Sequence, residues 1–196
     1  GPSRSAGVVG AQFVVQVPSA TSSAIEFTPD VVDLLSQVGR DHQGVQVTRV
    51  DGAGATSSFW YDLTPRVAPD DPTSDPIKVP KRAEEELAGL IDDLTAVVNE
   101  IPADAPEGRA LYLGLLKTTF LPDVPLVVIG APLDTTDPDN FADMAYDIDP
   151  AVLLDQLNSA GEVPDLTGIP SVTFVMLGQA GEQESICLSK DNSTTE

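Results

Sequence analysis

Val8-Val9-Gly10-Ala11-Gln12-Phe13-Val14-Val15-Gln16-Val17 is a nearly continuous apolar run, rich in β-branched residues, and Pro18 ends it. A strand covered on both faces has this pattern, and such strands belong to parallel sheets. Residues 126–129 and 172–177 form two further runs of the same character. We expect these three segments to form the centre of one mostly parallel sheet.

The first helix and two further strands follow from turn and cap signals. Thr28-Pro29-Asp30 predicts a helix start, with a capping hydroxyl, a proline in the first turn and an acid at the positive end. Gly39 ends this helix, and the alternating valines of residues 44–50 predict a second strand. Residues 51–54 predict a tight turn, so residues 59–61 open a third strand that pairs antiparallel with the second, at an edge.

The rest of the chain predicts three helices and two loops. Residues 65–80 contain five prolines and several aspartates, which is typical of an extended, flexible loop. A helix with one apolar face follows over residues 81–101, and another lies near residues 108–120. After the fourth strand we expect a long acidic loop and a helix over residues 149–161.

The alternation of strands and helices imposes right-handed crossovers. We therefore predict an α/β fold with a Rossmann-like, mostly parallel sheet of five strands in the order 3-2-1-4-5. The third strand is an antiparallel edge, and helices cover both faces. A chain of 196 residues suits one domain, which we place at residues 7–188. Residues 1–6, beginning with the remnant of a cleaved tag, would be a leader, and residues 189–196 a disordered tail.

The charge balance excludes several classes of partner. There are 31 acidic and 10 basic residues, a formal net charge of −21. A nucleic-acid-binding surface requires clustered Lys and Arg, and anionic lipid would be repelled. No run approaches the roughly 20 apolar residues of a membrane helix. An acidic surface promotes solubility; basic partners or divalent cations are the alternatives.

The single cysteine, Cys187, excludes an internal disulfide and any site built from several thiolates. It lies near the end of the last strand, and a small buried filler is the simplest interpretation. The single histidine, His42, lies in a turn at the amino edge of the sheet, away from the loops after the strands, and is expected at the surface. Asp92 and Asp93 would be solvated on a helix face, and no Gly-x-Ser-x-Gly motif is present. The residues indicate no enzyme.

The element order resembles that of a von Willebrand factor A-type domain. Residues 149–161, 163–168 and 172–178 are moreover similar to a domain of actinobacterial cell-envelope proteins, and the similarity extends over about residues 108–180. In that family the domain often precedes an OmpA-like module that binds peptidoglycan. No such module is present in this sequence. The resemblance implies an extracytoplasmic protein, in the cell envelope or secreted, with a protein partner.

An A-type domain holds its metal in an Asp-x-Ser-x-Ser loop after strand 1, helped by an Asp after strand 4. The matching loop here, residues 18–22, begins with Pro18, and Gly130-Ala131-Pro132 stands where the second Asp would be. Hydroxyl groups alone bind Mg²⁺ poorly, because such a site also requires carboxylate charge. We expect a degenerate site without metal or cofactor.

The loop nevertheless lies at the carboxyl edge of the sheet, where open α/β sheets bind their ligands. The candidate ligand- or partner-binding residues are Ser19, Thr21, Ser22, Asp134, Thr135, Thr136 and Asp137. Helix capping and turn formation are the alternative roles for them. Residues 134–155 also contain seven Asp, but their spacing fits no EF-hand, and a solvated acidic face is the simpler interpretation.

Our leading hypothesis is therefore a non-enzymatic, extracytoplasmic protein-binding or scaffold domain of the cell envelope with a degenerate metal site. The alternative is a small-ligand or calcium-binding domain that uses the loops at the carboxyl edge. A hydrolase is the third and least supported possibility.

Overall fold

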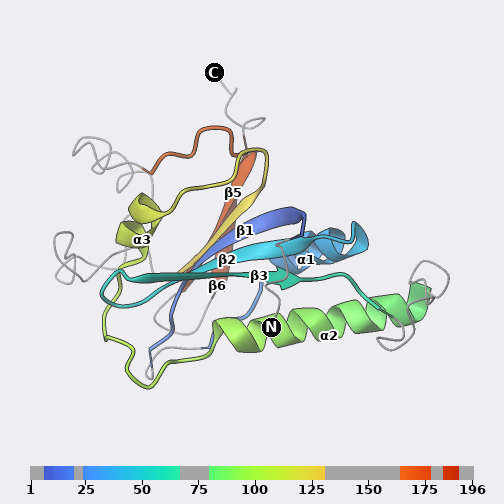
Figure 1. The fold of residues 1–196 in the computed structure, drawn as a ribbon, viewed down its shortest axis with the longest axis horizontal. Helices are drawn as coiled ribbons and strands as arrows, with labels where there is room; N and C mark the ends of the chain where they lie inside the picture. Colours follow the sequence, from blue (N-terminus) through green and yellow to red (C-terminus); the bar gives the residue numbers. More distant parts are fainter. Residues whose placement is uncertain (1–6, 20–23, 67–79, 131–163, 178–182, 190–196) are drawn as a thin grey trace.

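One sheet organises the described part of the chain, with its strands in the order β3-β2-β1-β4-β5-β6 (Figure 1). The computed structural model describes residues 7–19, 24–66, 80–130, 164–177 and 183–189. The strands are β1 (Val9–Gln16), β2 (Gly44–Val50), β3 (Thr56–Asp62), β4 (Leu126–Gly130), β5 (Ser171–Leu177) and β6 (Gln183–Ser189). The helices are α1 (Pro29–Arg40), α2 (Pro80–Val98) and α3 (Leu111–Lys117).

The predicted α/β topology is confirmed. β1 pairs in parallel with β2 and β4, β4 pairs in parallel with β5, and β3 pairs antiparallel with β2. The order 3-2-1-4-5 is therefore as expected, but the sheet does not end at β5. β6 pairs antiparallel with β5 and gives the described part of the chain a sixth strand. The expectation of five strands was too low by one.

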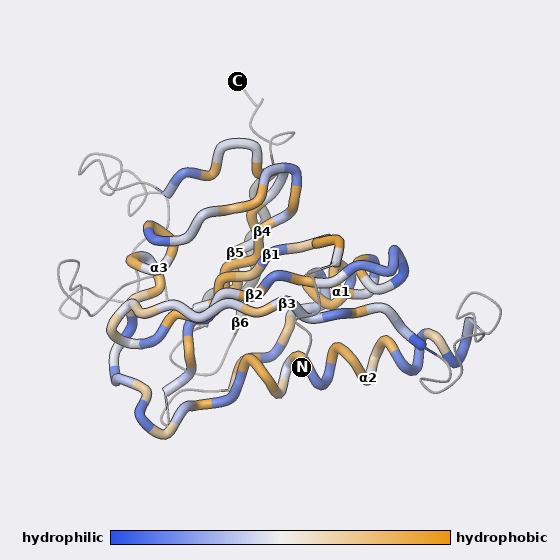
Figure 2. Tube along the Cα trace, in the orientation of Figure 1, coloured by the Kyte–Doolittle hydropathy of each residue, from blue (hydrophilic) through white to orange (hydrophobic). Residues whose placement is uncertain are grey.

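The two faces of the sheet bury separate apolar cores, so the expectation of helices on both faces is also confirmed. One core joins α1 and α2 to side chains such as Phe13, Val45 and Ile129. The other joins α3 to Val14 and Val128. Apolar residues concentrate in the central strands, whereas α2 alternates between apolar and hydrophilic positions (Figure 2). Among the described helices, none is long and apolar enough to span a membrane.

The ends of the helices differ in detail from the prediction. Pro29 does open α1, but the Thr28 hydroxyl does not cap it; Thr28 Oγ1 instead donates to Asp30 Oδ1 at 2.5 Å. The prediction of a capping hydroxyl was wrong, because Thr28 Oγ1 accepts no main-chain N–H of the first turn. α2 ends at Val98 rather than at residue 101, and α3 is shorter than residues 108–120.

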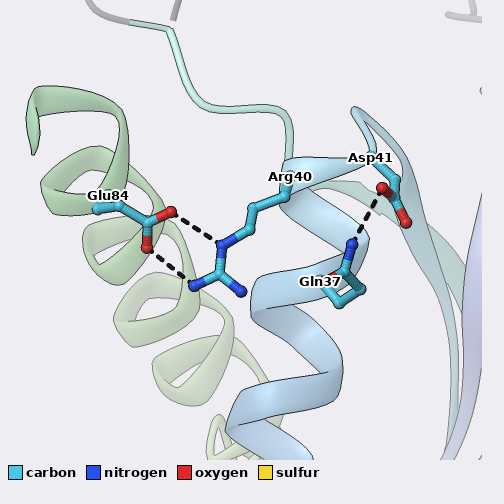
Figure 3. Close-up of polar contacts among 4 residues, drawn as sticks. All are labelled: Gln37, Arg40, Asp41 and Glu84. Atoms are coloured by element: carbon cyan, nitrogen blue, oxygen red, sulfur yellow. Dashed lines mark hydrogen bonds and ion pairs between the residues drawn. The ribbon is translucent and has the colours of Figure 1, made fainter. Parts of the chain in front are cut away.

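An ion pair links α1 to α2 at the surface (Figure 3). Arg40 Nε and Nη2 donate to the two carboxylate oxygens of Glu84 at 2.9 and 3.1 Å. The hydrogen bond from Arg40 lowers the pKa of Glu84 from its usual value. Both side chains are about half exposed, so solvent screens the attraction and the pair contributes little to stability. Apolar packing, rather than this pair, must hold the two helices together.

Two helical glycines provide a matched test of that packing. A Cβ on Gly39 of α1 would lie 2.3 Å from Leu87 Cδ1 and 2.8 Å from Leu63 O, whereas a Cβ on Gly89 of α2 would meet nothing within 4 Å. We expect Gly39→Ala to lower the free energy of unfolding by about 1–3 kcal/mol through overpacking. Gly89→Ala should raise it by about 0.5–1 kcal/mol through helix propensity. Urea unfolding measures both free energies. Changes of the same sign for the two variants would contradict this packing.

Several predicted segments lie largely or wholly outside the described residues. They are most of the proline-rich loop, the acidic loop after β4, the helix over residues 149–161, the leader and the tail. Predictions about them stay predictions.

Candidate functional site

The predicted site lies at the carboxyl edge of the sheet, where β1 and β4 run side by side in parallel. Of the candidate residues, the structure places only Ser19, which is half-buried shortly after β1. The others, Thr21, Ser22, Asp134, Thr135, Thr136 and Asp137, lie outside the described residues. Their convergence on one ligand therefore stays a prediction.

Among the described residues, neutral side chains lie beside Gly130 at the carboxyl end of β4. A Cβ added to Gly130 would lie 2.7 Å from Leu111 Cδ2 and 2.9 Å from Gln16 Oε1. Leu111 and Gln16 are 6% and 7% exposed, respectively. Pro18, at the leading position of the loop, is buried as well. A Mg²⁺ ion requires carboxylate ligands, and none of these residues supplies one.

Within the described residues, no group of three or more His, Cys, Asp or Glu side chains could hold a metal ion. The Asp-rich residues 134–155 lie outside this part of the chain, so the calcium alternative stays open.

The residues considered for catalysis are scattered. His42 is exposed in the turn between α1 and β2 and has a φ of 56°, a left-handed conformation. Asp92 and Asp93 are exposed on α2. These positions confirm the predicted surface location of all three residues. Cys187 lies in β6, in register with Thr173 of β5.

The face of the sheet that carries α3 contains a hollow of about 440 Å³. Alternate residues of three strands contribute polar side chains to it, and residues 117–121, after α3, also line it. Among the described lining residues, Lys117 alone is charged, and its Nζ donates to Gly54 O at 3.2 Å. The polar lining from the strands consists of Gln12, Gln46, Thr48, Thr56 and Ser58. Such a surface suits neutral polar groups.

Gln12 fixes the segment after α3 to the sheet. Its Nε2 donates to Leu121 O at 2.8 Å and to Val124 O at 3.0 Å, while its Oε1 accepts from Leu121 N at 2.8 Å. Gln46 is its register partner on β2, yet the Gln46 side chain makes no hydrogen bond with another described residue. Gln12 therefore has a structural role that Gln46 does not share within the described part of the chain.

Sequence reasoning missed this face of the sheet. We expected β1 to be apolar on both faces, but Gln12 and Gln16 share one face with Val14. Gln46 and Thr48 repeat the pattern on β2. Polar residues at a period of two are the available signal, because alternate residues of a strand face the same side.

β3 presents main-chain groups at the outer edge of the sheet. Asp51 N donates to Ala55 O, and Leu63 N donates to Gln43 O, so the odd-numbered residues direct their main-chain groups toward β2. Main-chain groups alternate in direction along an antiparallel strand. The N–H and C=O groups of the even-numbered residues 56–62 therefore point away from β2.

Comparisons with protein-family models, curated proteins and solved structures find no match to this chain. The sheet alone defines its class, an α/β protein with a Rossmann-like sheet.

Proposed function

We propose that this chain is a non-enzymatic protein-binding or scaffold domain of the von Willebrand factor A type with a degenerate metal site. The neutral side chains of Gln16 and Leu111 beside Gly130 carry the proposal. Metal-dependent chemistry or binding at this place would require a carboxylate, and the carboxamide of Gln16 lies there instead. The domain therefore binds its partner through other surfaces.

The location of this function is extracytoplasmic, in the cell envelope or after secretion. The similarity of residues 149–161 and 163–168 to a domain of actinobacterial cell-envelope proteins supports this part of the proposal. The net charge of −21 favours a basic protein partner over nucleic acid or anionic lipid.

Magnesium tests the degenerate site directly. We expect millimolar MgCl₂ to leave the Tm unchanged relative to NaCl at the same ionic strength, because only a ligand bound to the native state stabilises it. Differential scanning calorimetry makes the measurement. A rise of several degrees with MgCl₂ that Ser19→Ala removes would contradict the proposal.

One observation favours a second function, binding of calcium or a small ligand at the carboxyl edge. Residues 134–155 contain seven Asp and no basic residue, and Ca²⁺ binds carboxylate oxygens. In that case the candidate residues Ser19 and Asp134–Asp137 would act together.

A further inference from the structure

Soluble proteins normally protect the outer strands of their sheets. Charged side chains, prolines, bulges or short length prevent pairing with another chain. β3 has seven residues, and neither a proline nor a charge precedes Asp62. β6, on the other side of the sheet, has Glu184 within its sequence QESICLS. Among the described residues, β3 is therefore the less protected of the two edges of the sheet.

The β3 edge offers both hydrogen-bonding groups and apolar surface. The main-chain groups of the even-numbered residues 56–62 point outward, as derived above. Residues 56–58 are exposed, and the aromatic side chains of residues 59–61 are only half-buried. Phe59 and Tyr61 pack partly against the core that contains α1 and α2. An added strand could pair with this main chain and cover the remaining aromatic surface.

The hollow begins at the same strand. Thr56 and Ser58 line it from β3, and Thr48 Oγ1 lies 2.8 Å from Ser58 Oγ. Facing side chains of paired strands lie about 5 Å apart, so alternate side chains of an added strand would stand next to this hollow. Strand addition derives its affinity from the main chain and its specificity from such pockets.

The charges at this edge indicate the kind of partner. Asp51 and Asp62 flank β3. The pKa of Tyr61 is raised mainly by burial and further by the nearby negative charge of Asp93. Basic residues at the ends of an incoming segment would complement these acids. A second copy of the chain, with its own charge of −21, would be repelled.

We propose that β3 accepts an extended segment of a partner polypeptide as a further antiparallel or parallel strand. The segment carries Lys or Arg at its ends and places apolar side chains against Phe59 and Tyr61. This inference rests on the proposed binding function and names the class of its partner.

A library of random dodecapeptides displayed on phage provides the probe. We expect peptides selected on the wild-type domain to have basic ends and alternating apolar residues. For the tightest synthetic peptide, Ser58→Pro should raise the Kd at least about tenfold, because proline removes an outward N–H and strands a carbonyl of the peptide. Ser58→Ala also loses the bond to Thr48 but keeps the N–H, so it should raise the Kd by much less than Ser58→Pro does.

A second pair of variants guards against a folding defect in Ser58→Pro. Thr56 is exposed and is the first residue of β3, a position at which proline is tolerated. Thr56→Pro should weaken binding of the same peptide clearly more than Thr56→Ala does, and circular dichroism verifies the fold of each variant. Peptides that bind both proline variants as tightly as wild type would overturn the β3 site while leaving a binding function intact. An absence of selected peptides, or pairing of β3 between two copies of the domain, would also overturn it.

Discussion

Gln12→Ala is expected to lower the free energy of unfolding by about 2–4 kcal/mol, since it removes three hydrogen bonds from a buried side chain. Gln12 is 5% exposed, and its carboxamide bonds to the main chain of Leu121 and Val124. Those groups would lose their partner in the segment that leads into β4. Urea unfolding measures the free energy, and hydrogen exchange at Leu121 should accelerate in the variant.

Gln46→Ala is the matched control. Gln46 lies opposite Gln12 in the register of β1 and β2 and lines the same hollow, but without a hydrogen bond to a described residue. We expect its replacement to change the free energy of unfolding by no more than about 0.5 kcal/mol. Equal losses for the two variants would show that the hydrogen bonds of Gln12 do not hold this wall of the hollow.

Asn99→Ala is expected to cost about 2–4 kcal/mol as well, because it leaves two main-chain groups of a buried residue unpaired. Asn99 Oδ1 accepts from Ile25 N at 2.7 Å, and Asn99 Nδ2 donates to Ile25 O at 2.9 Å and to Thr95 O at 2.8 Å. Ile25 is fully buried. The carboxamide therefore pairs with both main-chain groups of Ile25, as a neighbouring strand would. It joins the segment before α1 to the end of α2.

Thr95→Ala is the control for Asn99. The Thr95 hydroxyl donates to Ile91 O at 2.8 Å, one turn earlier in the same helix, and this bond adds little to a helix. We expect a change below about 0.5 kcal/mol in the free energy of unfolding, measured with urea as for Asn99→Ala. If Asn99→Ala lowered the free energy of unfolding by no more than this, water or a shift of the segment would have to supply hydrogen bonds to the main chain of Ile25.

The sheet could be predicted from the sequence because local patterns determine it. The apolar runs of β1, β4 and β5, the alternation of β2 and the turn at residues 51–54 each specify one element and its neighbour. β6 lacks such a pattern, since its apolar residues are only Ile186, Cys187 and Leu188 among polar neighbours. Its pairing with β5 comes from the sheet, which local periodicity does not reveal.

The long-range polar contacts could not be predicted. Arg49 is an example: it is 9% exposed on β2 and donates to Val98 O and Glu100 O at the carboxyl end of α2. Burial lowers the pKa of its guanidinium, although the Glu100 charge opposes the change. Gln12, Asn99 and Arg49 all bond to residues at least 49 positions away. No spacing rule in a sequence identifies such partners.

The order of the elements was enough to predict part of the candidate site, but not all of it. Pro18 and Gly130 predicted a degenerate metal site, and Gln16 and Leu111 fill the space beside Gly130. The hollow over β1 to β3 and the outward direction of the even-numbered main-chain groups of β3 needed the register of the strands. Both features therefore emerged only with the structure.

Calorimetric titration with CaCl₂ tests most directly the claim that this domain works without a metal. We predict heats that match those of NaCl at the same ionic strength and do not saturate, because the acids then act only as a solvated surface. A saturating isotherm with about one site per chain and a dissociation constant at or below the millimolar range of weak extracellular sites would contradict the account. Loss of that isotherm in the double variant Asp137→Asn, Asp139→Asn would place the ion in the acidic segment and establish the calcium-binding alternative.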